Sequence, residues 1–309
     1  MMRSRQRLST TGTAMTLLLG LTVAAPSAAA DIEQTERLTY SAMLGGLHVA
    51  DLMVTLIQSE AGYSSGLEIV SRGVVRWVQD FRADINGVGG FALAPLPNGA
   101  EALQPMPVSF QREWTGGEFA SAMAMMFDPD TREAIVSERL YNPLTGEDLS
   151  RDDMPWNEDE RRENRKPVPE ELRRNVLDPM GAFISARRQI MAQGGATGST
   201  KSFRVPIYDG QRRYDIVGKT GPVRSTAING KETAVVPVSL KLEPVFGFNS
   251  RSSERMDDVD SRLYFSADGR FIPLQATMVS NMFAIVINLQ SDCGLNPAPC
   301  ETFGQEPTP

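Results

Sequence analysis

The chain has 309 residues, of which 41% are hydrophobic, and its 31 basic and 38 acidic residues give a net charge of −7. An acidic chain is a poor partner for nucleic acid or for anionic lipid head groups, so neither is expected to bind it. The length fits one large β-rich domain or two small ones, with a substantial core.

The first thirty residues have the composition of a secretory signal peptide. Arginines near the start precede an apolar run, Met15–Ala25, and small residues follow at 28–30. These are the three parts of such a signal, and the apolar run is too short to span a bilayer. We therefore expect cleavage after Ala30. The mature protein is expected to be periplasmic, with no transmembrane segment and no cofactor.

The N-terminal part of the mature chain has the pattern of a β-meander. From His48 to Ile57 the apolar residues alternate with period two, which predicts a strand whose Leu52, Val54 and Leu56 face the core. The run Gly73–Asn86 suits a strand with aromatic residues on one side or, as the alternative, a helix. The other strands predicted here are Leu38–Met43, Tyr63–Val70, Val108–Trp114 and Glu118–Phe127.

A highly charged stretch, residues 146–174, follows the meander. It holds ten acidic and seven basic residues and little apolar material. Such a composition cannot supply a hydrophobic face, so we predict a solvated surface loop. A docking arm for a protein partner is the alternative.

The clearest helix signal begins at Asp178. Aspartate is a good N-cap, Pro179 suits the first helical position, and Gly194-Gly195 are expected to end the helix. Its apolar residues fall mostly on one face. They are Met180, Phe183, Ile184, Ile190 and Met191.

The second half of the chain is predicted to be antiparallel, because short turn dipeptides separate its strands. Asp209-Gly210, Asn229-Gly230 and Asp268-Gly269 each suit a type I′ hairpin. The strands are Phe203–Tyr208, Arg213–Val217, Thr233–Leu242, Leu263–Phe265, Ile272–Val279 and Met282–Leu289. About a dozen strands with one amphipathic helix give a mostly β (α+β) domain over residues 31–290. A twisted sheet of that size must curl, and its mouth is a natural apolar ligand site.

Both cysteines lie near the C-terminus. In an oxidising compartment Cys293 and Cys300 are expected to form a disulfide that orders the tail, residues 291–309. A redox pair is the alternative, but the spacing and the two prolines between the cysteines argue against it.

Three patterns that could carry chemistry have simpler structural explanations. Residues 62–66 match the G-x-S-x-G pattern of a hydrolase, but a strand follows the serine and the single histidine, His48, precedes it. His48 also lacks companions for a zinc site. The acidic groups near Asp128 and Asp257 lack the glycine turn of a calcium loop. We therefore predict no catalytic residue and no metal site.

Several turn and strand motifs occur in a recognisable order. They are Leu38-Thr39-Tyr40 before Gly45-Gly46, Ser71–Val75, Asp178 at the helix start, Val205–Tyr214 and Leu263–Leu274. Together they resemble the exported bacterial family catalogued as domain of unknown function 3108 (DUF3108), over about residues 36–290. The resemblance implies a half-barrel, one curved antiparallel sheet wrapped around a helix, distantly similar to periplasmic lipoprotein carriers. It implies no catalytic residue.

The predicted function is non-enzymatic. We expect an exported envelope protein that binds a lipid or another hydrophobic ligand on the concave side of its sheet. The alternative is a structural or assembly factor of the envelope that acts through protein–protein contacts, and a hydrolase is the weakest hypothesis. The candidate ligand-binding residues are Trp77, Phe81, Trp114, Phe119, Met123, Met125, Phe183 and Met278.

Overall fold

The computed structural model describes residues 34–78, 80–95, 101–150, 166–192, 201–248, 259–280, 283–301 and 303. The chain divides into two units, residues 1–31 and 32–309, and all described residues belong to the second. The predicted signal peptide, residues 151–165 of the charged stretch and the predicted glycine end of the helix lie outside the described residues.

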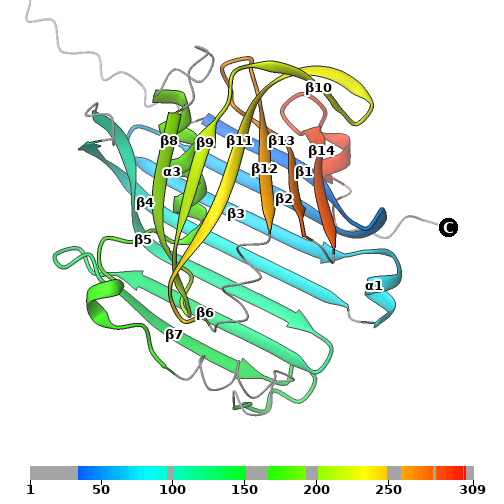
Figure 1. Ribbon diagram of the computed structural model, residues 1–309. Helices are drawn as coiled ribbons and strands as arrows, with labels where there is room; N and C mark the ends of the chain where they lie inside the picture. The colour runs from blue at the N-terminus through cyan, green and yellow to red at the C-terminus, as the bar shows by residue number, and fades with distance from the viewer. Residues whose placement is uncertain are drawn as a thin grey trace, which may run out of the picture. The chain divides into compact units, whose positions relative to one another are not determined.

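Among the described residues, fourteen strands form one antiparallel sheet (Figure 1). The first seven strands are β1 (Gln34–Leu44), β2 (Leu47–Gln58), β3 (Gly62–Ser71), β4 (Phe81–Pro95), β5 (Glu101–Gly116), β6 (Phe119–Phe127) and β7 (Ala134–Tyr141). The others are β8 (Lys201–Tyr208), β9 (Arg213–Thr220), β10 (Arg224–Ile228), β11 (Lys231–Phe246), β12 (Asp260–Ser266), β13 (Pro273–Val279) and β14 (Ala284–Asp292).

The strand order is β7-β6-β5-β4-β3-β2-β1-β14-β13-β12-β11-β9-β8, and β10 pairs with β11. Most strands therefore lie beside their neighbours in the sequence. The exceptions are β9, which pairs with β11 and not with β10, and the joint in the middle, where the first strand pairs with the last.

A segment of the chain between β7 and β8, residues 166–178, bridges these two edge strands, and we call it the strap. It includes a short 3₁₀ turn, η2 (Glu170–Leu172). The Ala134 N–H donates to the Arg173 carbonyl at 3.0 Å, and the Leu177 N–H donates to the Pro206 carbonyl at 2.9 Å. The strap thus satisfies backbone groups on both edges and nearly closes the sheet into a barrel. The described part of the charged stretch differs here from the solvated loop expected, because Val168 is buried.

The helix α3 (Pro179–Ala192) lies on one face of the sheet, called the inner face below. The Asp178 carboxylate accepts hydrogen bonds from the Met180 and Gly181 N–H groups at 2.8 and 2.9 Å, so the predicted N-cap is confirmed. The inner face carries the core. One cluster surrounds Phe110 and Met125, and a second packs Phe203 and Phe265 against α3. The predicted fold class, one large antiparallel sheet around a helix, is confirmed.

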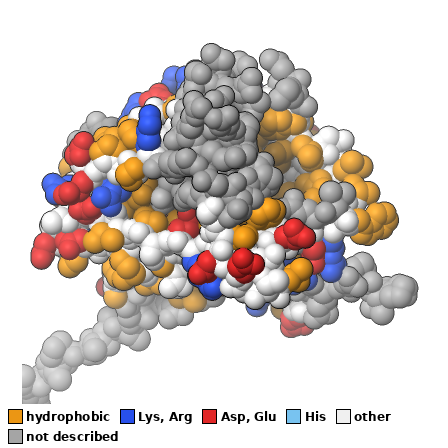
Figure 2. All heavy atoms as spheres, turned by 90° about the horizontal axis from the view of Figure 1, so that it is seen from below, with side chains coloured by type: hydrophobic (Ala, Val, Ile, Leu, Met, Phe, Trp, Pro, Cys, Tyr) orange, Lys and Arg blue, Asp and Glu red, His pale blue; other side chains and the backbone are white. Residues whose placement is uncertain are grey.

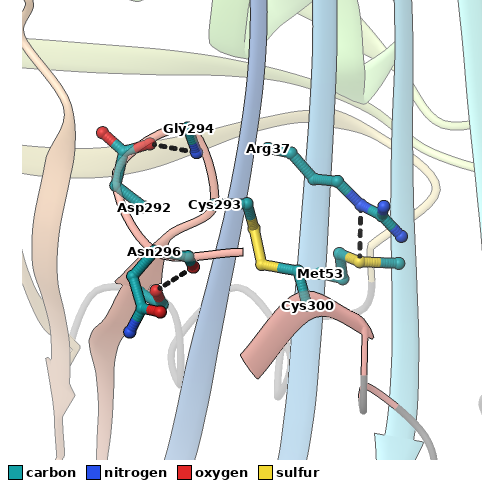
Figure 3. Close-up of a disulfide and its surroundings, with 8 residues drawn as sticks. Arg37, Met53, Asp292, Cys293, Gly294, Asn296 and Cys300 are labelled. Carbon is teal, nitrogen blue, oxygen red and sulfur yellow. Dashed lines mark hydrogen bonds between the residues drawn. A yellow bond between two sulfur atoms is a disulfide. The ribbon is translucent and has the colours of Figure 1, made fainter. Parts of the chain in front are cut away.

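The predicted disulfide between Cys293 and Cys300 is present in the segment that follows β14 (Figure 3). The Cys293 N–H donates to the Arg37 carbonyl of β1 at 2.8 Å, and the short helix α5 (Ala298–Glu301) contacts the same strand. Arg37 and Met53, whose side chains meet at 3.2 Å, point away from the inner face. The disulfide segment therefore packs on the outer face of β1 and β2.

Three local predictions need correction. The run Gly73–Asn86 is not one strand, because a short helix, α1 (Gly73–Val78), precedes β4. Strand β7 was not predicted, because charged residues interrupt its apolar pattern, and neither was the five-residue β10. A type I′ turn needs positive φ at both central residues. Of the three predicted turns, only Asn229-Gly230 meets this condition, since Gly210 and Gly269 have positive φ but the aspartates before them do not.

Candidate functional site

The barrel has two ends that differ in what covers the inner face. The plugged end, where β1 and β3 begin and β2 ends, is occupied by α3. The open end, where β2 and β4 begin and β1 and β3 end, has no helix on its inner face among the described residues. We describe the plugged end first, because it decides whether the helix is fixed.

A buried ion pair fixes α3 to β1. The Arg187 guanidinium donates to both carboxylate oxygens of Glu36, at 2.5 and 2.7 Å, and also to the Arg270 carbonyl at 2.5 Å. Only 8% of the Arg187 side chain is exposed. A bidentate arginine–carboxylate pair holds both partners in one geometry, and separating it inside the protein would leave an unpaired charge.

Two further polar contacts hold the same helix. The Ser185 hydroxyl donates to the Gln104 side-chain oxygen of β5 at 2.7 Å. The Arg188 guanidinium lies 3.8 Å from the centre of the Phe91 ring and donates to Gln58 at 3.0 Å. The helix therefore contacts β1, β2, β4 and β5 through polar and cation–π interactions in addition to its apolar packing.

The N-terminus of α3 contains a buried acid. One oxygen of Asp178 forms the cap, while the other oxygen and the Tyr63 hydroxyl have no hydrogen-bond partner among the described residues. Burial raises the pKa of Asp178 to about 6. Burial and the neighbouring Asp178 raise the pKa of Tyr63 as well. A Cβ on Gly181 would lie 2.9 Å from Asp178 Oδ2 and 3.0 Å from Tyr63 Oη, so glycine leaves room for both groups.

At the open end, the inner face is apolar but only half-buried. Near α3 the inward residues Leu38, Tyr40 and Leu56 are buried, whereas several large apolar residues further along the same face are only half-buried. The Phe81 and Trp114 rings stack there with centroids 6.3 Å apart. We call this surface the open wall. Its residues are Leu52, Ile69, Phe81, Trp114, Phe119, Leu240, Leu263, Met278, Ile285 and Ile287.

The predicted ligand-binding residues divide into three groups. Phe81, Trp114, Phe119 and Met278 lie together on the open wall. Met123 and Met125 share the inner face but are buried in the core cluster around Phe110, where they have no accessible surface to offer. The last two lie elsewhere. Phe183 packs from α3 against the core, and Trp77 stands on α1 with 87% of its surface exposed.

Sequence analysis missed a polar cluster on the inner face. The Glu138 carboxylate accepts from the Ser121 hydroxyl at 3.0 Å and from the Gln211 amide at 3.1 Å, and Arg112 lies 3.4 Å away. Gln211 belongs to the β8–β9 turn, so the cluster fastens this turn over β6 and β7. The alternation of the strands would have predicted that Arg112 and Ser121 point inward. Glu138 could not be placed in this way, because it lies on β7, which was not predicted.

The outer face carries two hollows. A groove of about 510 Å³ lies over β3, β4 and β5, lined by charged residues and by the apolar side chains of Val70, Tyr141 and Phe303, and a smaller one of about 260 Å³ adjoins it. The register places Glu68, Asp84 and Glu113 side by side across the three strands. Burial and the neighbouring Asp84 raise the pKa of Glu68. Acids in a row repel one another and do not suit a hydrophobic ligand, so the open wall is the better candidate site.

The hydrolase pattern does not have the geometry of a nucleophile elbow. All five of its residues, 62–66, lie within strand β3, and Ser64 pairs with Ile57, near the opposite end of β2 from His48. The His48 ring lies 2.7 Å from Asp51. Within the described ranges, no group of three His, Cys, Asp or Glu side chains is placed to hold a metal ion. No helix in the described part of the chain is long and apolar enough to cross a membrane.

The fold and the open wall define a class of protein, a nearly closed antiparallel barrel with a helix fixed in one end. A family model for a protein of unknown function (DUF3108) matches residues 100–282, and the chain belongs to this family. The predicted family is thus confirmed.

Comparison with curated proteins finds no match. Among solved structures, a beta-barrel-like protein of the domain of unknown function DUF1849 from Brucella abortus is similar. It has 11% sequence identity and a TM-score of 0.47, and the match covers 82% of this chain and 95% of that one.

Proposed function

We propose that this protein is a non-enzymatic envelope protein that binds a lipid or another hydrophobic ligand on the open wall. The observation that carries the proposal is the change along the inner face: α3 covers its apolar residues at the plugged end, whereas the apolar residues of the open wall are only half-buried. Apolar surface left half-exposed on a concave sheet gains about 25 cal/mol for each Å² that a ligand covers. The composition of residues 1–30 and the disulfide support export to the periplasm as part of the proposal.

The test compares two adjacent residues of β13 that point to opposite faces. Met278 points to the open wall and Thr277 to the outer face, and both are half-buried. Met278→Glu would place a carboxylate against the acyl chain, so we expect its affinity for a fluorescent fatty acid to fall about tenfold or more. Thr277→Glu should bind as the wild type does. Both variants are first checked for an unchanged melting temperature.

Native mass spectrometry of the protein purified from cells, followed by lipid extraction, gives the second readout. A bound lipid in stoichiometric amount supports the proposal and identifies the ligand class. A protein that carries no lipid and takes up neither fatty acid nor phospholipid would contradict it. The structural or assembly factor that acts through protein contacts would then be the better hypothesis.

A further inference from the structure

One arginine of α3 has no acidic partner among the described residues. Arg187 and Arg188 are adjacent, and Arg187 is paired with both carboxylate oxygens of Glu36. Arg188 instead donates to the Gln58 side-chain oxygen at 3.0 Å, and its guanidinium lies 3.8 Å from the centre of the Phe91 ring. Neither contact brings a negative charge. Arg188 is therefore a half-buried cation whose charge no carboxylate balances within the described ranges.

Partial burial favours an anionic partner for this guanidinium. Burial and the neighbouring Arg187 lower the pKa of Arg188. A guanidinium has five N–H donors, and in the described part of the chain Nη2 donates to Gln58, which leaves the Nη1 group for a ligand. Its planar fork of donors matches a carboxylate or a phosphate group, and the hydrogen bonds to such a group are charge-assisted.

The β4–β5 hairpin extends beyond its neighbouring strands at the plugged end, at the upper left of Figure 1. β3 pairs with β4 only as far as Gly90, and β6 pairs with β5 only as far as Ser109. We call the part beyond these pairs, residues 91–95 and 101–107, the arm. Among the described strands, none lies beside the arm on either edge, so α3 is the element that packs on it.

Exposed apolar side chains lie next to Arg188 on the arm and on α3. Leu93 is on the same face of β4 as Phe91, two residues further along, and it pairs with Leu103 of β5. These two leucines are 67% and 40% exposed. Met191 is 44% exposed and lies three residues beyond Arg188, so the two side chains are neighbours on the helix surface.

This combination differs from the rest of the surface on the same side. Figure 2 shows acidic and basic side chains close together at the left, the side on which the plugged end lies in Figure 1. Arg188 is bordered by apolar side chains and by no acid within the described ranges. The chemical complement of such a surface is an anionic group joined to an apolar chain.

We infer that Arg188 and the arm form a second binding site, for an amphiphile that carries a carboxylate or phosphate group on a short aliphatic chain. The anionic group binds the Arg188 guanidinium, and the chain covers Leu93, Leu103 and Met191. The net charge of −7 opposes binding to an anionic membrane as a whole, but a single small ligand meets the charge local to its site. This site lies at the opposite end of the barrel from the open wall and does not depend on the proposed function.

Isothermal titration calorimetry with octanoate, octanol and acetate tests the charge and the chain separately. We expect octanoate to bind more tightly than octanol, which lacks the charge, and more tightly than acetate, which lacks the chain. Arg188→Gln should weaken octanoate binding about tenfold or more, because it removes a charge-assisted hydrogen bond. Arg188→Lys keeps the charge but loses the planar fork, so it should retain part of the affinity.

Arg82→Gln is the matched control. Arg82 is exposed on the outer face of β4 and loses the same charge, so its substitution should leave octanoate binding unchanged. Melting temperatures of all variants are compared first. If Arg188→Gln does not fold, Leu93→Glu tests the site from an exposed position, because its carboxylate should repel octanoate.

Three results would overturn the inference. One is equal affinity of octanoate and octanol, or of octanoate and acetate. Another is an equal effect of Arg188→Gln and Arg82→Gln. The third is octanoate binding that Met278→Glu abolishes and Arg188→Gln does not change, because the ligand would then lie on the open wall. That third result would support the proposed function, so the two proposals can fail separately.

Discussion

The plugged and open ends of the barrel are built from similar apolar side chains, yet only at the plugged end does a helix cover them and complete a packed core. At the plugged end, α3 covers Tyr63 and Leu56 and is held by the Arg187–Glu36 ion pair. At the open end, residues such as Trp114 and Ile285 keep part of their surface accessible. The difference shows that stability and the candidate ligand surface are separated along the same strands. Substitutions at the plugged end should therefore lower the stability of the fold, whereas substitutions on the open wall should mainly weaken ligand binding.

The largest expected effect comes from the ion pair of the plugged end. Arg187→Ala leaves the Glu36 carboxylate without its partner, which costs about 3–5 kcal/mol when both groups are buried. Arg204 is the control, since it pairs with Asp215 and Glu243 but is 51% exposed. Arg204→Ala should cost much less, because solvent screens an exposed ion pair. Urea unfolding measures both, and equal losses would mean that this pair does not hold the helix.

Two methionines on the inner face compare the ends directly. Met125 is fully buried, so Met125→Ala should lower the free energy of unfolding by about 2–5 kcal/mol. Met278 lies on the half-buried open wall, and Met278→Ala should cost about 1 kcal/mol or less, because its side chain has less surface to lose. Thermal or urea unfolding gives both values. A loss for Met278 as large as that for Met125 would indicate that the open end is also closed core.

The buried acid at the start of α3 makes stability depend on pH. The pKa of Asp178 is raised from 3.8 to about 6, so the folded state holds this proton more tightly than the unfolded state does. Its contribution is full below about pH 4 and is lost as the pH rises through about 6. The loss is at most about 3 kcal/mol.

The variant Asp178→Asn keeps a good N-cap but cannot titrate. We expect it to be more stable than the wild type at pH 7.5, and the difference to fall as the pH is lowered to 4. Urea unfolding at several pH values measures this. A difference that does not change with pH would exclude the burial of a charged Asp178 as its cause.

The last prediction concerns the disulfide segment on the outer face, whose removal should affect stability but not ligand binding. Cys293→Ser removes the link to Cys300, and a loop of this length stabilises the folded state by about 2–2.5 kcal/mol in the chain-entropy model. Fatty acid binding on the open wall should not change, since the segment packs on the opposite face. Melting temperatures and binding of Cys293→Ser measure the two effects, and weaker binding would show that the faces are coupled.

The sequence allowed most of the fold to be predicted and about half of the candidate site. Period-two alternation located β2 and β6, and Asp178-Pro179 located the start of α3, because these signals are local. Strand β7 was missed because Glu138 faces inward into a polar cluster, an arrangement that alternation cannot reveal.

The burial of the candidate site residues was equally hidden. Met123 and Met278 have the same chemistry and both point inward, and only the position of α3 and the β8–β9 turn decides which one is covered. Trp77 was predicted to bind ligand from a run that suits a strand or, as the alternative, a helix. It lies on the helix α1, which starts at Gly73, and its indole is exposed.

The pairing of β1 with β14 has a consequence for how the chain folds. Ser41 and Gln290 meet across this joint although 249 residues separate them. The strands on either side, β2–β7 and β8–β13, pair mostly with near neighbours in the sequence, so their partners are available soon after they are synthesised. The joint must wait for the last strand, and contacts of such long sequence separation form slowly because a long loop must first be closed. Until then the first strand keeps one unpaired edge, which is prone to pairing with other chains. Once β14 has paired with β1, the hydrogen bond from the Cys293 N–H to the Arg37 carbonyl adds a further contact to this joint, because Cys293 directly follows β14.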